Sequence, residues 1–85
     1  MDNPQLDDQE FLTNIIKSLV TVPDSVLAKR TVDKMGVLIQ FWVAKADMPF
    51  LIGRYGDNIK ALRQIARMVG YRSKSNISLK IEEPA

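Results

Sequence analysis

The 85-residue sequence contains no cysteine and no histidine. The first absence excludes disulfide bonds and thiolate metal sites, and the second removes the commonest general base and the commonest metal ligand. Long apolar runs are also missing, because no stretch approaches the ~20 residues that a membrane helix needs. The N-terminal segment MDNPQLDDQE is acidic and polar, unlike a secretory signal. These absences predict a cytoplasmic protein with no metal, no cofactor and no membrane contact.

Charge is distributed unevenly along the chain, although the net charge is only +2. Residues 1–24 carry five acids against one base, whereas residues 25–85 carry eleven bases against five acids. Six of those bases and a single acid, Asp57, lie between residues 54 and 74. Such a cluster is either a solvated helix face or a surface that binds phosphate.

Hydrophobic periodicity predicts a single domain over residues 1–85, frayed at 1–5. The expected elements begin with a helix over 7–20 and two strands over 25–32 and 37–44, joined by a turn at 33–36. A short helix capped by Asp47 and ended by Gly53 follows, and then a longer helix capped by Asp57 and ended by Gly70. The last element is a strand over 77–82. This α-β-β-α-α-β order predicts a two-layer α+β fold. A helical crossover favours parallel pairing of the last two strands, giving a mixed three-stranded sheet with three helices on one face.

The segment LIGRYGDNI, residues 51–59, places two glycines at the junction of the two central helices. A helix N-terminus attracts anions, and a glycine before it lets a phosphate approach the backbone. Arg54 can contact phosphate oxygens through its planar guanidinium group. Tyr55 can offer a stacking face or a hydroxyl. The other interpretation is a plain corner between two helices, in which Gly53 ends one helix and Gly56 relieves strain.

The same segment resembles the signature of the hnRNP K homology (KH) domain, in which a GxxG loop clamps about four nucleotides. With IIKSLVTVPDSV before it and ISLKIEE after it, the chain is similar to the small bacterial single-KH RNA-binding proteins of the KhpA (YlqC) family. The resemblance extends from about Phe11 to Glu83 and implies a type II KH fold. It also implies single-stranded RNA binding in a regulatory or RNA-chaperone-like role.

Matching the motif residue by residue implies a backbone clamp made of Gly53, Arg54, Tyr55 and Gly56. An apolar floor for bases would come from Leu51, Ile52 and Ile59, and further RNA contacts from Asn58, Lys60 and Arg63. Two residues depart from the usual family pattern. Tyr55 either adds base stacking or crowds the clamp, and Asp57, interpreted as a helix N-cap, weakens phosphate binding.

The resemblance also implies partners, because some family members pair with themselves or with a larger KH-containing protein of the Jag (KhpB) type. Leu38 and Trp42 share the strand face opposite the helices and form a candidate interface. Alternatively, Trp42 is covered by the stems of neighbouring Lys and Arg side chains. The alternative function is a protein–protein adaptor or dimerisation module that leaves the GxxG loop unused. An enzyme is not expected, since the central acids Asp47 and Asp57 are both explained as helix caps.

Overall fold

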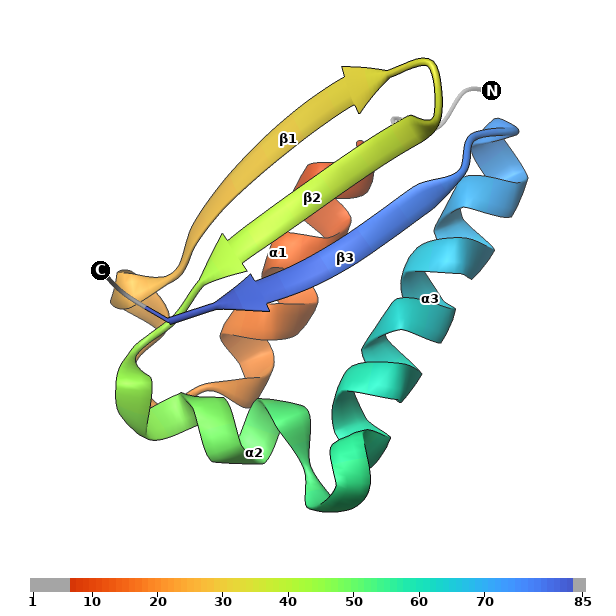
Figure 1. Ribbon diagram of the computed structural model, residues 1–85. Helices are drawn as coiled ribbons and strands as arrows, with labels where there is room; N and C mark the ends of the chain where they lie inside the picture. The colour runs from red at the N-terminus through yellow and green to blue at the C-terminus, as the bar shows by residue number, and fades with distance from the viewer. Residues whose placement is uncertain (1–6, 84–85) are drawn as a thin grey trace.

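The predicted α-β-β-α-α-β order is confirmed by a computed structural model, which describes residues 7–83 (Figure 1). The helices and strands are α1 (Asp8–Leu19), β1 (Leu27–Asp33), β2 (Gly36–Trp42), α2 (Met48–Ile52), α3 (Asp57–Ser73) and β3 (Ile77–Glu82). Short 3-10 turns lie at Pro23–Ser25, Lys45–Asp47 and Arg54–Gly56. β1 begins two residues later than predicted, because the turn opened by Pro23 extends through Ser25.

The sheet has the strand order β1-β2-β3 and is mixed, as predicted. β1 runs antiparallel to β2, with Ala28 opposite Phe41, and β3 runs parallel to β2, with Leu79 opposite Ile39. Figure 1 shows the three helices on one face of this sheet, while the other face is left open. The fold is therefore a two-layer α+β domain of the type II KH order.

The core lies between the sheet and the helices. Alternate residues of the β2 segment point into it, because side chains on a strand alternate between its two faces. The predicted inward set is confirmed, since Val37, Ile39 and Phe41 of β2 and Val43, the residue after it, are all buried. The remaining buried apolar side chains come from both layers and include Leu12, Ile16, Leu51, Ile59, Leu62, Ala66, Ile77 and Leu79.

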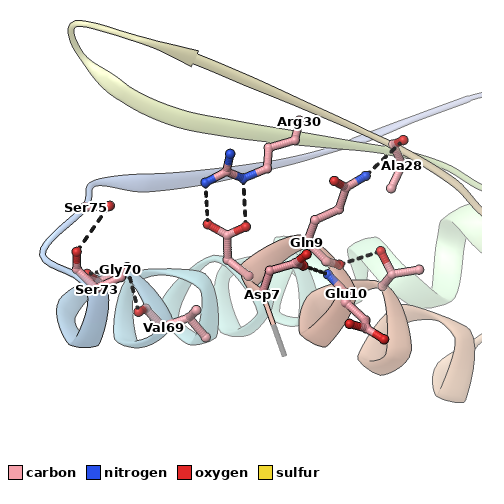
Figure 2. Close-up of polar contacts among 11 residues, drawn as sticks. Asp7, Gln9, Glu10, Ala28, Arg30, Val69, Gly70, Ser73 and Ser75 are labelled. Carbon is pink, nitrogen blue, oxygen red and sulfur yellow. Dashed lines mark hydrogen bonds and ion pairs between the residues drawn. The ribbon is translucent and has the colours of Figure 1, made fainter. Parts of the chain in front are cut away.

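Helix α1 begins at Asp8, and the carboxylate of Asp7 caps it by accepting a hydrogen bond from the Glu10 backbone N–H at 2.7 Å. Two further contacts attach this end of α1 to β1 (Figure 2). Arg30 donates to both carboxylate oxygens of Asp8 at 2.8 and 3.1 Å, and the Gln9 side-chain amide donates to the Ala28 carbonyl at 3.3 Å. These contacts link the first helix to the outer strand of the sheet.

Asp47 is not the side-chain cap that the sequence predicted for α2. Its carboxylate is buried, with 3% of the residue exposed, and accepts hydrogen bonds from the backbone N–H and the hydroxyl of Thr21, each at 2.9 Å. The Val22 N–H donates to its second oxygen at 3.4 Å. The Thr21 backbone hydrogen bond is the main reason that the pKa of Asp47 lies below its usual value. Asp47 therefore joins the α1–β1 connection to the start of α2.

Gly70 does not end the last helix, contrary to the prediction. α3 continues to Ser73, and Lys74, in the left-handed conformation, is its C-cap. Gly70 is buried inside the helix, and a Cβ atom there would lie 2.4 Å from the Ser75 carbonyl oxygen. The Gly70 carbonyl also accepts a hydrogen bond from the Ser75 N–H at 2.8 Å. This glycine is needed because the chain folds back closely over α3 before it enters β3.

Candidate nucleic-acid interface

The loop between α2 and α3 has the tight geometry expected of the two glycines. Gly53 ends α2 with φ 78° and ψ 172°, and its N–H donates to the Pro49 carbonyl at 2.9 Å. Gly56 precedes α3 with φ 76° and donates from its N–H to the Gly53 carbonyl at 3.1 Å. Both conformations lie where side chains with a Cβ are strained. Arg54 and Tyr55 are therefore held at the tip of a single turn in front of α3.

Asn58 has a structural contact beneath this loop. Its side-chain amide donates to the Phe50 carbonyl at 2.6 Å, which ties the first turn of α3 to α2. A Cβ atom at Gly53 would lie 2.7 Å from the Asn58 Cγ and 2.8 Å from its backbone nitrogen. Gly53 is thus required by close packing as well as by its backbone angles. The role of Asn58 in RNA binding stays a prediction.

Asp57 is not the N-cap of α3. The cap is Gly56, and Asp57 is the first helical residue, with φ −63° and ψ −40°. The N–H groups of Gly56 and Asp57 already donate to the carbonyls of Gly53 and Arg54, and within residues 7–83 no side chain caps the N–H groups that follow. These groups and the positive end of the helix dipole therefore remain available to an anion. The Asp57 side chain is exposed in the same turn and adds a negative charge there.

The predicted contact residues differ in how accessible they are. Arg54, Lys60 and Arg63 are exposed, and Tyr55 is 86% exposed. Of the three residues predicted to form an apolar floor, only Ile52 presents much surface, at 36% exposure. The other two, Leu51 and Ile59, are buried at 0% and 7%. They belong to the buried core cluster and support the loop from within, where α2 contacts α3.

A cleft of about 170 Å³ lies between α3 and β3. Its lining residues are Arg63, Arg67, Asn76, Ile77, Ser78 and Leu79. Figure 1 shows that α3 and β3 meet at the turn joining them and diverge in the other direction, with the glycine loop at the far end of α3. The sequence predicted an RNA contact for Arg63, and Arg67 follows it one turn later on α3. It did not indicate the β3 residues, because nothing local shows that this strand lies beside α3.

The outer edge of β3 contributes backbone groups to this cleft. The Val37 N–H donates to the Asn76 carbonyl at 2.8 Å. In a parallel ladder a strand uses the backbone groups of every second residue, so those of Asn76 and Ser78 face β2. The N–H and C=O groups of Leu79 consequently face the open edge, beside the two arginines. The cleft combines positive charge with a free backbone donor and acceptor.

Residues 7–83 lack two other features, a cluster of metal ligands and a membrane-spanning helix. No group of three acidic side chains in this part of the chain is arranged to hold a metal ion. None of the helices in the same range combines the length and the apolar character that crossing a bilayer requires.

Comparison with known proteins identifies relatives along nearly the whole chain. The Chlamydia pneumoniae protein named RNA-binding protein KhpA is 37% identical over 75 residues, covering 88% of this chain and 96% of the relative. The protein of the same name from Listeria monocytogenes is 31% identical, covering 88% and 99%. The crystal structure of Aquifex aeolicus Era bound to GDP and aluminium fluoride has the same fold. It aligns with a TM-score of 0.61 at 21% identity, covering 98% of this chain and 32% of Era.

The family model described as KhpA/KhpB, KH domain matches residues 9–81. The match includes both central helices, the glycine loop between them and nearly all of β3. Together with the relatives above, it bears out the resemblance seen in the sequence: the chain belongs to the KhpA/KhpB family of KH domains.

Proposed function

We propose that this protein binds single-stranded RNA along α3, from the glycine loop to the cleft beside β3. The observation that carries the proposal is the continuity of this surface. The N-terminus of α3, which has no side-chain cap, lies behind the exposed Arg54 and leads to Lys60, and then to a cleft lined by Arg63 and Arg67. The relatives named RNA-binding protein KhpA support the same ligand.

Each part of the surface suits a different part of a nucleotide strand. Phosphate oxygens fit the loop, where glycine permits close approach and the free N–H groups of α3 add to the guanidinium of Arg54. Lys60 lies exposed in the first turn of α3 and supplies further positive charge to the backbone. Unpaired bases fit the cleft, because their edges can pair with the backbone groups of Leu79 and contact the Arg63 side chain.

A cleft that contacts base edges favours one unpaired strand over a duplex, since the bases of a duplex are already paired and turned inward. We place the protein in the cytoplasm with its RNA ligand and propose a binding role, regulatory or chaperone-like, without catalysis. Most of the proposed contacts are to the phosphates of the RNA. We therefore expect weak sequence preference, because phosphate contacts carry no sequence information.

The test is fluorescence anisotropy with a labelled eight-nucleotide RNA, free or annealed to its complement. We expect tighter binding to the single strand. We also expect roughly a tenfold loss of affinity between about 50 and 200 mM salt, through release of counterions from the contacted phosphates. An affinity independent of salt would contradict the phosphate contacts. A protein that bound no RNA at low salt would instead be an adaptor.

We also propose that the open sheet face receives a second KH-containing chain, either another copy or a larger partner of the KhpB type. Leu38 and Trp42 are partly exposed there, and the residues paired with Trp42 across the sheet are Leu27 and Glu82. Lys80 lies on the same face two residues before Glu82, and its ammonium is 3.6 Å from the Glu82 carboxylate, so the β3 side of this surface is charged. Leu27 is itself 65% exposed, which extends the apolar surface.

Replacing Trp42 with Lys should abolish this association, because a charge would be buried against the partner. Light scattering of the protein alone, and of its mixture with a KhpB-type KH domain, measures the mass of the complexes. Tyr71→Lys is the matched control, since it changes an exposed aromatic residue on α3 instead. A folded Trp42→Lys variant that keeps the wild-type mass in both samples would refute the interface.

A further inference from the structure

We propose that the ring of Tyr55 stacks on an unpaired base of the nucleotide held at the glycine loop. This inference rests on the proposed RNA binding and adds base stacking to it. The first observation is the backbone of Tyr55, which has φ 57° and ψ 23°. A bulky residue in this left-handed region is strained, and strain of this kind collects at functional sites.

The only other non-glycine residue with positive φ in residues 7–83 is Lys74. Its conformation follows from its place as the C-cap of α3, where its N–H bonds back to the last turn. Tyr55 is the third residue of the turn closed by the bond from the Gly56 N–H to the Gly53 carbonyl, a position that favours glycine or asparagine, and its own side chain does nothing to stabilise this conformation. Within the described residues no hydrogen bond to its hydroxyl is found, and glycine or asparagine would adopt this conformation more readily.

The second observation is exposure. The Tyr55 side chain is 86% exposed, so its ring contributes little to the hydrophobic core. A ring that neither packs nor bonds within the fold, yet occupies a strained position, is available to a ligand. It follows Arg54 and precedes Gly56, so a phosphate seated at the start of α3 would bring its own base within reach.

The chemistry of the ring decides what it binds. An aromatic face accepts any of the bases, and such stacking tolerates changes of sequence. A phenol hydroxyl could instead donate to a phosphate, and the two possibilities make different predictions for phenylalanine. The absence of a charge on the ring also means that its contribution should persist when salt weakens the phosphate contacts.

The experiment compares wild type, Tyr55→Phe and Tyr55→Asn on two labelled RNAs of eight nucleotides, one normal and one with abasic nucleotides throughout. Asparagine is chosen because it tolerates positive φ. On normal RNA we expect Tyr55→Asn to bind about tenfold more weakly and Tyr55→Phe to match wild type. On the abasic strand, wild type and both variants should bind equally. Tyr71→Asn is the control, because Tyr71 is equally exposed, at 85%, on the outer face of α3.

Three results would overturn the stacking contact. Equal affinity of wild type and Tyr55→Asn for normal RNA would show that the ring contributes nothing. A loss in Tyr55→Phe as large as in Tyr55→Asn would assign the contact to the hydroxyl. An equal loss on normal and abasic RNA would assign it to the shape of the loop. Failure of the wild type to bind either RNA would be a different result, since it would reject the proposed function itself.

Discussion

Replacing Gly56 with aspartate is expected to lower the affinity for short single-stranded RNA at least about tenfold at low salt, while the domain stays folded. The new carboxylate would stand at the N-terminus of α3, where the phosphate is proposed to sit. It would repel the phosphate through its negative charge. A Cβ atom at Gly56 meets nothing closer than the Ile59 Cγ2 at 3.7 Å and the Lys60 Cε at 3.9 Å.

Gly56→Asn is the matched control for this experiment. Asparagine has the same shape as aspartate, lacks the charge and tolerates the φ of 76° that this position requires. We expect Gly56→Asn to keep most of the affinity in the anisotropy assay, with circular dichroism confirming that both variants are folded. If the two variants bound RNA equally well, the charge would not face a phosphate, and the loop would not be the clamp.

The same change at Gly53 would be less informative. A Cβ atom there would lie 2.7–2.9 Å from atoms of Asn58, including its backbone nitrogen, so the start of α3 would have to move. The hydrogen bond from Asn58 to the Phe50 carbonyl would be disturbed at the same time. A loss of RNA binding in a Gly53 variant would therefore not separate a phosphate contact from a distorted loop.

Replacing Gly70 with alanine is expected to lower the free energy of unfolding by about 1–3 kcal/mol. Helix propensity alone predicts the opposite, a gain of up to about 1 kcal/mol, because glycine is the poorer helix former. The structure reverses the sign. The new methyl group would lie 2.4 Å from the Ser75 carbonyl oxygen and 3.2 Å from the Ile77 nitrogen, and backbone atoms cannot swing aside as a flexible side chain can.

Urea denaturation of wild type and Gly70→Ala measures this difference. The matched control is Ala61→Gly, at an exposed position of the same helix, which reports propensity without a close contact and should lose about 0.5–1 kcal/mol. A Gly70→Ala protein more stable than wild type would show that the turn into β3 can move away. Because that turn closes one end of the cleft, the variant should also bind RNA more weakly.

Much of the fold follows from local patterns in the sequence. The 3.6-residue period of apolar positions predicted α1 and α3, and alternation predicted β2 and β3 with the correct inward faces. The short loop between α2 and α3 was expected from Gly53 and Gly56, whereas Asp7, predicted as the first residue of the helix, is instead its N-cap. These features depend on neighbours a few positions away, so the sequence contains the information directly.

The roles of individual polar and small residues were decided by tertiary structure. Asp47 and Asp57 both look like caps in the sequence. One instead bonds to Thr21, 26 positions earlier, while the other begins a helix that Gly56 already caps. Gly70 looks like a helix end in the sequence, but it lies inside α3, where the Ser75 carbonyl packs closely against it.

The candidate site likewise has one part that is visible in the sequence and one part that exists only in the folded chain. The sequence by itself determined the glycine loop with its Arg54 and the cluster of basic residues between positions 54 and 74. Only the folded chain brings Asn76, Ser78 and Leu79 beside Arg63 to make a cleft. The physical reason is that a side chain bonds or packs with whatever groups the fold places next to it. Groups distant in sequence become neighbours only when the sheet and helices have packed together.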